Sequence, residues 1–460
     1  MIADLKPYSV YKESGLPWLG AVPKHWDMRP AFGAFLPNHE RNYGMKERTV
    51  LSLSYGRIVI KPEEKLHGLV PESFETYQIV NPGDIVLRTT DLQNDHTSLR
   101  VGMVRDRGII TSAYLALRVK VGVSPDFGFQ FLNVWDASKA IYGYGSGLRQ
   151  NLDFSHFKRM PVSVPPPAEQ AAIVRFLAWA GGRLERAIRA KRKVIALLNE
   201  QKQAIIARTV TRGIDPSVPL KPSGISWLAE IPQHWTIVRN LALFTHRVEQ
   251  GIPGLPVLQV SLHSGITAED LDQFGRAKRL IADHTKYKLI RKSDLAYNTM
   301  RMWQGAAGVC PTDGLVSPAY VVVKPRIGVD PRFYEFVFRT VVYKQQINRY
   351  STGIVSDRNR LYWESFKQMP NFLLPVEEQQ EICRFIQEET SSLDAAIKRL
   401  QREIELLREY RTRLVADVVT GKLDVREAAG RLPIAVVPDI GEDDANQGID
   451  PEAEDEEAVA

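Results

Sequence analysis

The chain has 460 residues, of which 44% are apolar and 25% are charged, values that are ordinary for a globular protein of about two to four domains. Its longest apolar runs fall far short of the roughly 20 residues that a membrane-spanning helix needs, and its first residues lack the basic start and apolar centre of a signal peptide. Cys310 and Cys383 are the only cysteines. We therefore expect a cytoplasmic protein without a disulfide framework or a structural metal site.

The net charge of +6 is unevenly distributed. Residues 431–460 hold ten acidic residues and one arginine, a charge of −9, which leaves +15 on residues 1–430. A basic body favours polyanionic partners because each neutralised phosphate releases counterions, although surface lysine and arginine can also serve solubility alone. The acidic segment is predicted to be disordered, since it is highly charged.

Two parts of the chain repeat at a fixed offset of 209 residues. The pattern P-x-x-E-Q-x-x-I-x-x-F at residues 166–176 returns at 375–385. The pattern W-L-x-x-[IV]-P-x-H-W at residues 18–26 returns at 227–235. A constant offset over such distances indicates a tandem duplication.

Each copy begins with a mixed half, at residues 1–165 and 214–374. Short runs rich in Val, Ile, Leu and Tyr alternate there with Gly, Pro, Asn and Asp, which is typical of strands and turns. Helical patterns lie between these strands at residues 126–140 and 331–349. Both halves are therefore predicted to be α/β or α+β domains.

Each copy ends in a predicted long helix, at residues 168–212 and 377–420, where proline is absent and Gly181-Gly182 is the only glycine pair. Heptad seams that start at Ile173 and Ile382 are each apolar at eight of eleven positions, in the same register. Two matching seams favour helices that pack on each other as a coiled coil. We expect the antiparallel direction, because it separates two similar bulky domains, and a kink at the glycine pair.

The predicted fold class is therefore mixed α+β, with two α/β domains separated by two long helices that form an antiparallel coiled coil, in a pseudo-twofold tandem repeat. The predicted segments are a first domain, a first spacer helix, a second domain, a second spacer helix and an acidic tail. Their boundaries are residues 1–165, 166–213, 214–374, 375–430 and 431–460.

These residues resemble the specificity subunit of Type I restriction-modification systems. The likeness rests on the two paired motifs and on the heptad runs that end at Val210-Thr211 and Val419-Thr420, and it covers about residues 10–430. It implies two target-recognition domains, each reading one half of a split, asymmetric site on double-stranded DNA. The helices would set the gap and dock two methyltransferase (M) subunits, and motor-nuclease (R) subunits would complete the complex.

The resemblance also implies that this chain binds no cofactor itself. The partner methyltransferase would use S-adenosylmethionine, and the motor subunit would use ATP and Mg. The sequence agrees in lacking an Asn-Pro-Pro-Tyr or Asp-Pro-Pro-Tyr run and a phosphate-binding loop. We therefore predict a non-catalytic subunit with no catalytic or metal-binding residues. Two alternatives stay open: a standalone or fused DNA endonuclease or methyltransferase, and a coiled-coil scaffold without DNA specificity.

Candidate DNA-reading loops mix planar, hydrogen-bonding and cationic side chains, because Arg or Lys pairs with guanine and Asn or Gln pairs with adenine. Within an otherwise aligned frame, the stretches 147–152 and 353–361 differ by three residues, as expected of a variable reading loop. The candidates in the first copy are Arg88, Thr89, Thr90, Gln93, Asn94, Tyr144, Ser146, Arg149, Gln150 and Asn151. The candidates in the second copy are Asn298, Arg301, Trp303, Gln304, Ser351, Thr352, Arg358, Asn359 and Arg360. Each of these can also be read as a solvated turn residue.

The predicted helices carry the candidate partner-docking residues. These lie in the two E-Q motifs and on the basic face of the first helix: Glu169, Gln170, Arg183, Arg186, Glu378 and Gln379. The basic face can meet acidic partner surfaces or track phosphates. The apolar stripes are expected to be core before they are partner surface, and the repeated His25 and His234 favour an architectural role over metal ligation.

Overall fold

The structure is a computed structural model that describes residues 5–62, 73–90, 92, 99–144, 151–226, 228–262, 265–268, 286–353 and 359–433. The chain divides into two compact units: unit 1 comprises residues 1–190 and 402–460, and unit 2 comprises residues 191–401. Each unit contains one mixed half and a part of both long helices. The five sequence segments stay a prediction, and most of the acidic tail lies outside the described residues.

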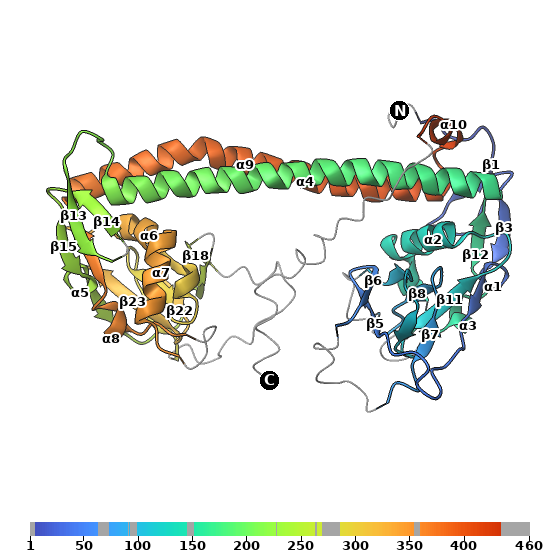
Figure 1. The fold of residues 1–460 in the computed structure, drawn as a ribbon, viewed down its shortest axis with the longest axis horizontal. Coiled ribbons are helices and arrows are strands. Elements are labelled where there is room, and N and C mark those ends of the chain that lie inside the picture. Colours follow the sequence, from blue (N-terminus) through green and yellow to red (C-terminus); the bar gives the residue numbers. More distant parts are fainter. Residues whose placement is uncertain are drawn as a thin grey trace. The chain divides into compact units, whose positions relative to one another are not determined.

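The mixed half of unit 1, in which Figure 1 labels β8 and β11, is built on an antiparallel sheet of four short strands in the order β4-β11-β8-β9. These are β4 (Phe35–Pro37), β11 (Leu115–Val119), β8 (Ile85–Leu87) and β9 (Val101–Met103). Two-stranded antiparallel ladders add β7 (Gln78–Val80) to β10 (Gly108–Ile110), β5 (Leu51–Ser54) to β6 (Arg57–Ile60), β3 (Asp27–Pro30) to β12 (Pro161–Val164), and β1 (Tyr11–Glu13) to β2 (Ala21–Pro23). The helical elements are α1 (Ala31–Ala34), α2 (Pro125–Ala137), the 3-10 turn η2 (Ala140–Gly143) and α3 (Phe154–Phe157).

Unit 2 repeats this topology strand for strand, with a central sheet in the order β16-β23-β20-β21. These are β16 (Phe244–Arg247), β23 (Tyr320–Pro325), β20 (Leu295–Asn298) and β21 (Ala307–Val309). The ladders join β19 (Lys288–Ile290) to β22 (Gly314–Val316), β17 (Leu258–Ser261) to β18 (Gly265–Ala268), β15 (Thr236–Arg239) to β24 (Pro370–Leu373), and β13 (Leu220–Ile225) to β14 (Leu228–Pro232). The helical elements are α5 (Asn240–Leu243), the 3-10 turn η4 (Met302–Gln304), α6 (Pro331–Arg339), α7 (Val341–Tyr350) and α8 (Trp363–Phe366).

The same capping chemistry starts the helix that covers each sheet. In α2 the hydroxyl of Ser124 accepts the Phe127 backbone N–H at 3.2 Å, and in α6 the carboxylate of Asp330 accepts the Arg332 N–H at 3.0 Å. A proline occupies the first helical position in both cases, where its missing N–H has no partner to lose. The mixed halves are therefore duplicated in their local signals as well as in their topology.

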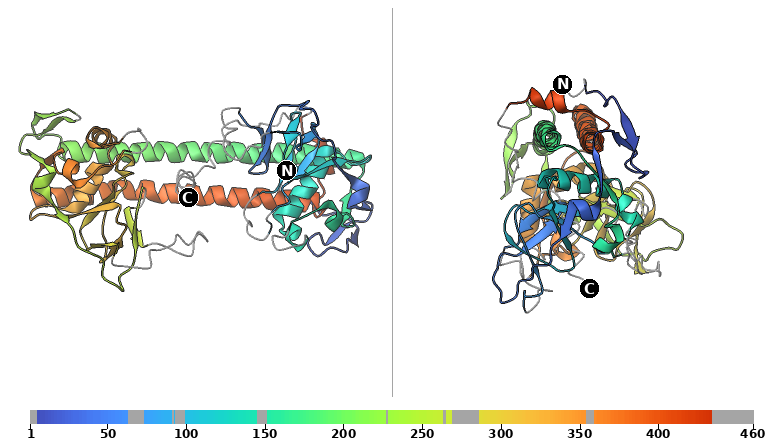
Figure 2. Two further views of the ribbon diagram at one scale, coloured as in Figure 1. Left: turned by 90° about the horizontal axis from the view of Figure 1, so that it is seen from below. Right: turned by 90° about the vertical axis from the view of Figure 1, so that its right-hand side faces the viewer.

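Both long helices are present as α4 (Pro167–Arg212) and α9 (Val376–Val419), and a short α10 (Arg426–Gly430) follows in unit 1. In unit 1 they lie side by side (Figure 2), because Ile173 and Phe176 near the start of α4 share a buried cluster with Leu414 and Val418 near the end of α9.

In unit 2, Lys202 of α4 bonds Asp394 of α9 at 2.6 Å, and the end of α4 at Gly213 lies beside Glu378 at the start of α9. In each unit, then, the end of one helix lies beside the start of the other. The predicted mixed α+β tandem repeat with a pair of antiparallel helices is confirmed.

The predicted heptad positions are buried near the start of α4, but toward its end the buried residues no longer follow the heptad pattern. Ile173, Leu177, Ala180 and Leu184 are all buried, whereas Val194 is 44% exposed. In the last turns the buried apolar residues of α4 are Ile206 and Val210, neither of which is a seam position. The reason is geometric: an α-helix has 3.6 residues per turn, so a strict seven-residue pattern rotates by about 20° per heptad. The glycine pair 181–182 does not interrupt α4.

Candidate nucleic-acid interface

The E-Q motif anchors each long helix to its own mixed half. In unit 1 the carboxylate of Glu169, 5% exposed, accepts hydrogen bonds from Trp26 Nε1 at 2.8 Å and from Tyr8 Oη, and it lies 2.9 Å from His25 Nε2. Burial and the adjacent carboxylate raise the pKa of the Tyr8 hydroxyl. In unit 2 Glu378 repeats two of these contacts, with Trp235 Nε1 at 3.1 Å and His234 Nε2 at 2.8 Å.

The glutamine that follows this glutamate, Gln170 in unit 1 and Gln379 in unit 2, makes a second set of hydrogen bonds that is also the same in both units. Gln170 donates to the carbonyls of Gly122 and Pro165, both at 2.8 Å, and accepts the Ser124 N–H at 2.8 Å. Gln379 donates to the carbonyls of Gly328 at 3.0 Å and Leu374 at 2.8 Å, and accepts the Asp330 N–H at 2.7 Å. The motif recurs because it ties the helix start to the W-L-x-x-[IV]-P-x-H-W turn and to the cap of α2 or α6.

These contacts reduce the number of candidate docking residues that a partner protein can reach. Gln170 and Gln379 are 1% and 0% exposed, and Glu169 is 5% exposed, so a partner cannot reach these side chains while the unit stays folded. Glu378 keeps 25% of its side chain exposed, but both of its oxygens are engaged. Of the six candidates, Arg183 and Arg186 are exposed on α4, with the Arg183 guanidinium 5.3 Å from the Trp179 ring centroid.

In unit 1 the structure brings the two predicted reading stretches together. The loop after β8 contains Arg88, Thr89 and Thr90, and the Leu152 N–H donates to the Thr89 carbonyl at 2.8 Å, which places Asn151 beside this loop. Thr89 is buried and donates to the Ala113 carbonyl at 3.2 Å, so it supports the loop and is not displayed. Tyr144 packs edge-on against Trp135, with ring centroids 5.5 Å apart, and burial raises the pKa of its hydroxyl. Five further candidates lie outside the described residues: Gln93, Asn94, Ser146, Arg149 and Gln150.

A buried arginine that sequence reasoning missed holds this loop. Arg100 has no exposed surface, and its guanidinium donates to the carbonyls of Thr90 at 2.9 Å and Arg88 at 3.3 Å. Its backbone N–H donates to the Asp136 carboxylate at 2.7 Å. Nothing in the local sequence marks this residue, because its partners lie on the neighbouring strand end and on α2.

In unit 2 the same two stretches meet through the same bonds. Thr299 donates to the Ala319 carbonyl at 2.9 Å, and the Leu361 N–H donates to the Thr299 carbonyl at 2.9 Å. Thr352 and Arg360 exchange two backbone hydrogen bonds at 3.0 Å.

The remaining candidates of unit 2 are partly engaged within the loop. Asn298 Oδ1 accepts the Met300 N–H at 3.0 Å, Trp303 Nε1 donates to the Met300 carbonyl at 3.0 Å, and Ser351 Oγ donates to the Ile347 carbonyl at 2.8 Å. Arg301, Gln304 and Asn359 are half-buried, and Arg358 lies outside the described residues.

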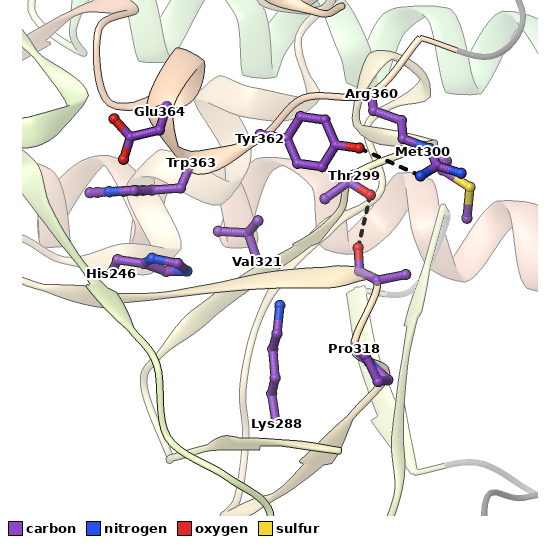
Figure 3. A pocket seen from close by; sticks show the side chains of 11 residues that line it. His246, Lys288, Thr299, Met300, Pro318, Val321, Arg360, Tyr362, Trp363 and Glu364 are labelled. Carbon is purple, nitrogen blue, oxygen red and sulfur yellow. Dashed lines mark hydrogen bonds between the residues drawn. The ribbon is translucent and has the colours of Figure 1, made fainter. Parts of the chain in front are cut away.

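A cavity of about 560 Å³ opens where these stretches of unit 2 meet (Figure 3). Thr299, Met300 and Arg360 from the reading stretches line it, together with residues from other strands and from α8: His246, Lys288, Pro318, Ala319, Val321, Tyr362, Trp363 and Glu364. Tyr362 and Trp363 lie two and three residues after Arg360. An aromatic pair close to a basic residue is therefore a sequence signal that could have identified them. His246 and Lys288 come from distant strands and carry no local signal.

Two copies of one α/β frame, each continued by a long helix that pairs with the other, define a tandem-repeat protein that presents the same loop position twice. No protein-family model matches the chain, and no curated protein matches its sequence. A chain in a structure described as "Structural basis underlying complex assembly and conformational transition of the type I R-M system" shares the fold, with a TM-score of 0.58 and 14% identity over 86% of this chain and 98% of that one. The resemblance to Type I specificity subunits is thereby confirmed as a likeness of fold.

Two further solved structures match with TM-scores below 0.5. The HsdS subunit from Thermoanaerobacter tengcongensis gives 0.40 at 15% identity, over 87% of this chain and 98% of that one. The Type I restriction-modification S subunit from M. genitalium gives 0.31 at 11% identity, over 86% of this chain and 96% of that one.

Among the helices that the structure describes, none is long and apolar enough to cross a membrane.

Proposed function

We propose that this chain is a non-catalytic, sequence-specific DNA-binding subunit of a Type I restriction-modification complex. The mixed half of each unit reads one half of a bipartite, asymmetric site, and the paired helices set the spacing. One observation carries the proposal: a single hydrogen-bonded frame is used twice, and the residues displayed at the same place on it differ between the two copies. Two readers with one architecture and different chemistry are what an asymmetric, split site requires.

The displayed residues are of the types that read base edges. In unit 1 they are Arg88, Thr90 and Asn151, and in unit 2 they are Asn298, Arg301 and Arg360; Asn151 and Arg360 are exposed and the other four are half-buried. Arginine matches guanine and asparagine matches adenine in the major groove. The charge of +15 on residues 1–430 supplies phosphate contacts, which hold the protein on DNA without selecting sequence.

Partners follow from the same role. Two methyltransferase (M) subunits would bring the chemistry and motor-nuclease (R) subunits would add cleavage, and the complex would work on DNA in the cytoplasm. Arg183 and Arg186 on the exposed face of α4 are the docking residues we propose, because the other candidates are taken up inside their units.

The test is selection of binding sites from a randomised duplex library by the full chain, followed by titration with salt. We expect a split motif and an affinity that falls steeply with salt concentration. Binding without any sequence preference would favour the coiled-coil scaffold instead. Methyl transfer by the purified chain alone would show that it is an enzyme.

The spacing role has its own test. Inserting one heptad into each helix, at facing positions near the Lys202–Asp394 pair, lengthens the pair by about 10 Å. The preferred gap should grow by about three base pairs, at 3.4 Å per base pair, while both half-sites keep their sequences. A variant that folds and retains the original gap would show that the helices are not the ruler.

A further inference from the structure

The floor of the unit 2 cavity is formed by a lysine with donors to spare. Lys288 starts β19, is half-buried, and donates one hydrogen bond to the Tyr320 carbonyl at 2.6 Å. An ammonium group has three donors, and Lys288 has no carboxylate partner among the described residues. Burial lowers the pKa of this ammonium group. Figure 3 shows its side chain rising into the cavity, so its remaining N–H groups face whatever enters.

The walls of the cavity suit a planar heterocycle. His246 and Trp363 are stacked, with ring centroids 5.2 Å apart and planes 20° from parallel, and Tyr362 and Val321 also contribute apolar surface. Burial and the nearby Lys288 lower the pKa of His246, which favours the neutral form of its ring. Aromatic and apolar walls favour a base, whereas a phosphate would lose hydration against them.

The charged groups at the rim add donors. Arg360 lines the rim and makes a long hydrogen bond of 3.5 Å to the Tyr362 hydroxyl. Glu364 is the acidic residue of the lining, and its charge is offset by an ion pair with Lys367. The cavity therefore offers two cationic donor groups to one ligand. Guanine is the base with two acceptors, O6 and N7, on its major-groove edge, whereas adenine and cytosine present an amino donor there.

At the equivalent positions, unit 1 has the same backbone arrangement but different side chains. Gln78 corresponds to Lys288, since each occupies the first position of its strand and donates to the carbonyl of an equivalent tyrosine, Tyr114 at 2.7 Å in unit 1. The second amide N–H of Gln78 is used on the Thr111 carbonyl at 3.0 Å. Asn151 corresponds to Arg360, because each precedes the leucine that bonds the loop threonine. Unit 1 thus has amides where unit 2 has cations.

From this geometry we propose that the unit 2 cavity recognises a guanine base in its half-site, with Lys288 donating to N7 and Arg360 donating to O6. The inference rests on the proposed function and deepens it, because it names the base and the residues that select it. Lys288 is the specificity-determining residue at the floor, and Arg360 is the second donor at the rim. The His246–Trp363 pair and Val321 form the apolar wall beside which the guanine edge lies.

The experiment compares the full chain with Lys288→Gln, a change that installs the residue unit 1 has at this place and keeps a donor for the Tyr320 carbonyl. Lys292→Gln is the control, because Lys292 is exposed and its loss removes the same charge outside the cavity. Sites are selected from a randomised duplex library, and the affinity is then measured with 7-deazaguanine, which lacks the N7 acceptor, at each guanine in turn. We expect Lys288→Gln to lose about tenfold of discrimination at one guanine of one half-site, with Lys292→Gln unchanged.

The 7-deazaguanine probe at that position should weaken binding of the original chain and have little effect on Lys288→Gln. Arg360→Asn should relax the preference at the same position. Uniform weakening on all sequences, with a salt slope lower by about one, would mean that Lys288 contacts a phosphate, and the inference would be wrong.

A split motif that no guanine probe or Lys288 substitution alters would also overturn the inference while leaving the proposed function in place. If the unmodified chain selects no motif at all, the proposed function fails and takes the inference with it. The unmodified chain with the 7-deazaguanine probe gives an answer even if a variant folds poorly.

Discussion

In unit 1 the loop after β8 is held from inside by the buried side chain of Arg100, whereas in unit 2 the equivalent loop after β20 carries Ala306 at that place and closes through the turn η4. The equivalence is set by the backbone, because Arg88 N–H donates to the Arg100 carbonyl at 2.8 Å and Asn298 N–H donates to the Ala306 carbonyl at 3.0 Å. Two different sets of contacts therefore stabilise the same loop position. The backbone position is retained, and the means of holding it has diverged together with the displayed residues.

A second pair of contacts shows a conserved charge contact built from different strands. Asp84 pairs with Arg118 of β11 at 3.0 Å, and its equivalent Asp294 pairs with Arg247 of β16 at 2.6 Å. Both carboxylates also accept a backbone N–H from the residue three positions earlier, at 2.9 Å. The position of the carboxylate is fixed, because it caps the turn before β8 or β20. Its arginine partner comes from a different strand in each unit.

The largest expected difference between the units is a change at Arg100. Arg100→Ala removes a fully buried guanidinium and leaves the carbonyls of Arg88 and Thr90 in a dry environment without their side-chain donor, so the free energy of unfolding should fall by about 3–5 kcal/mol. Urea unfolding of the full chain measures this. Arg105→Ala is the control, because Arg105 is 61% exposed and its contact with Asp126 at 3.7 Å is a surface pair. Equal losses for the two variants would contradict the role of Arg100.

The two glutamine anchors test how closely the units match. Gln170→Ala and Gln379→Ala each leave two carbonyls and one backbone N–H without their side-chain partner, and we expect each to lower the free energy of unfolding by about 3 kcal/mol. Gln380→Ala is the matched control, since Gln380 is the next residue along and is exposed. Because the hydrogen bonds are the same in both units, the two losses should agree within about 1 kcal/mol in urea unfolding. A large difference would show that one anchor has taken on a further role.

The ion pairs between the helices should matter little in either unit. Glu185 and Arg411 are 3.0 Å apart in unit 1, Lys202 and Asp394 are 2.6 Å apart in unit 2, and all four side chains are partly exposed. Arg411→Gln and Asp394→Asn should each cost less than about 1 kcal/mol, and the cost should shrink in high salt. Urea unfolding at low and high salt measures this. A cost that does not respond to salt would mean that the pairs are more buried in solution.

The smallest expected effect is a pH dependence that only unit 2 contains, because Pro37 takes the place of His246 in unit 1. Burial and Lys288 lower the pKa of His246, partly opposed by Glu364. A base whose pKa is lower in the folded state binds fewer protons there than in the unfolded state, so its contribution to stability is present above about pH 6.5 and is lost as the pH falls below it. His246→Phe keeps a ring against Trp363 without titrating. The difference in melting temperature between this variant and the original chain should change between pH 7.5 and 5; a constant difference would contradict the assignment.

Much of the architecture was predictable from sequence because repetition and helical periodicity are properties of consecutive residues. The offset of 209 residues and the two long helices follow from the sequence alone, whereas the reading role of the loops stays a prediction. The motif around Glu169 and Gln170 was recognised as a repeat, but its hydrogen bonds within the unit were not predicted. Its partners, such as Trp26 and Ser124, lie far away in the chain, and burial depends on all of them at once.

Only the tertiary structure decided which residues meet. Lys288 faces the cavity since β19 pairs with β22 and its ammonium reaches Tyr320, a contact across 32 residues. His246 arrives from β16, and Arg100 joins the strand end to α2. The drift of the seam along α4 is likewise invisible in a seven-residue pattern, because it arises from the 3.6-residue turn of a helix packed in space. The sequence by itself determined that one frame is used twice, and the packing of distant strands decided which side chains each copy presents.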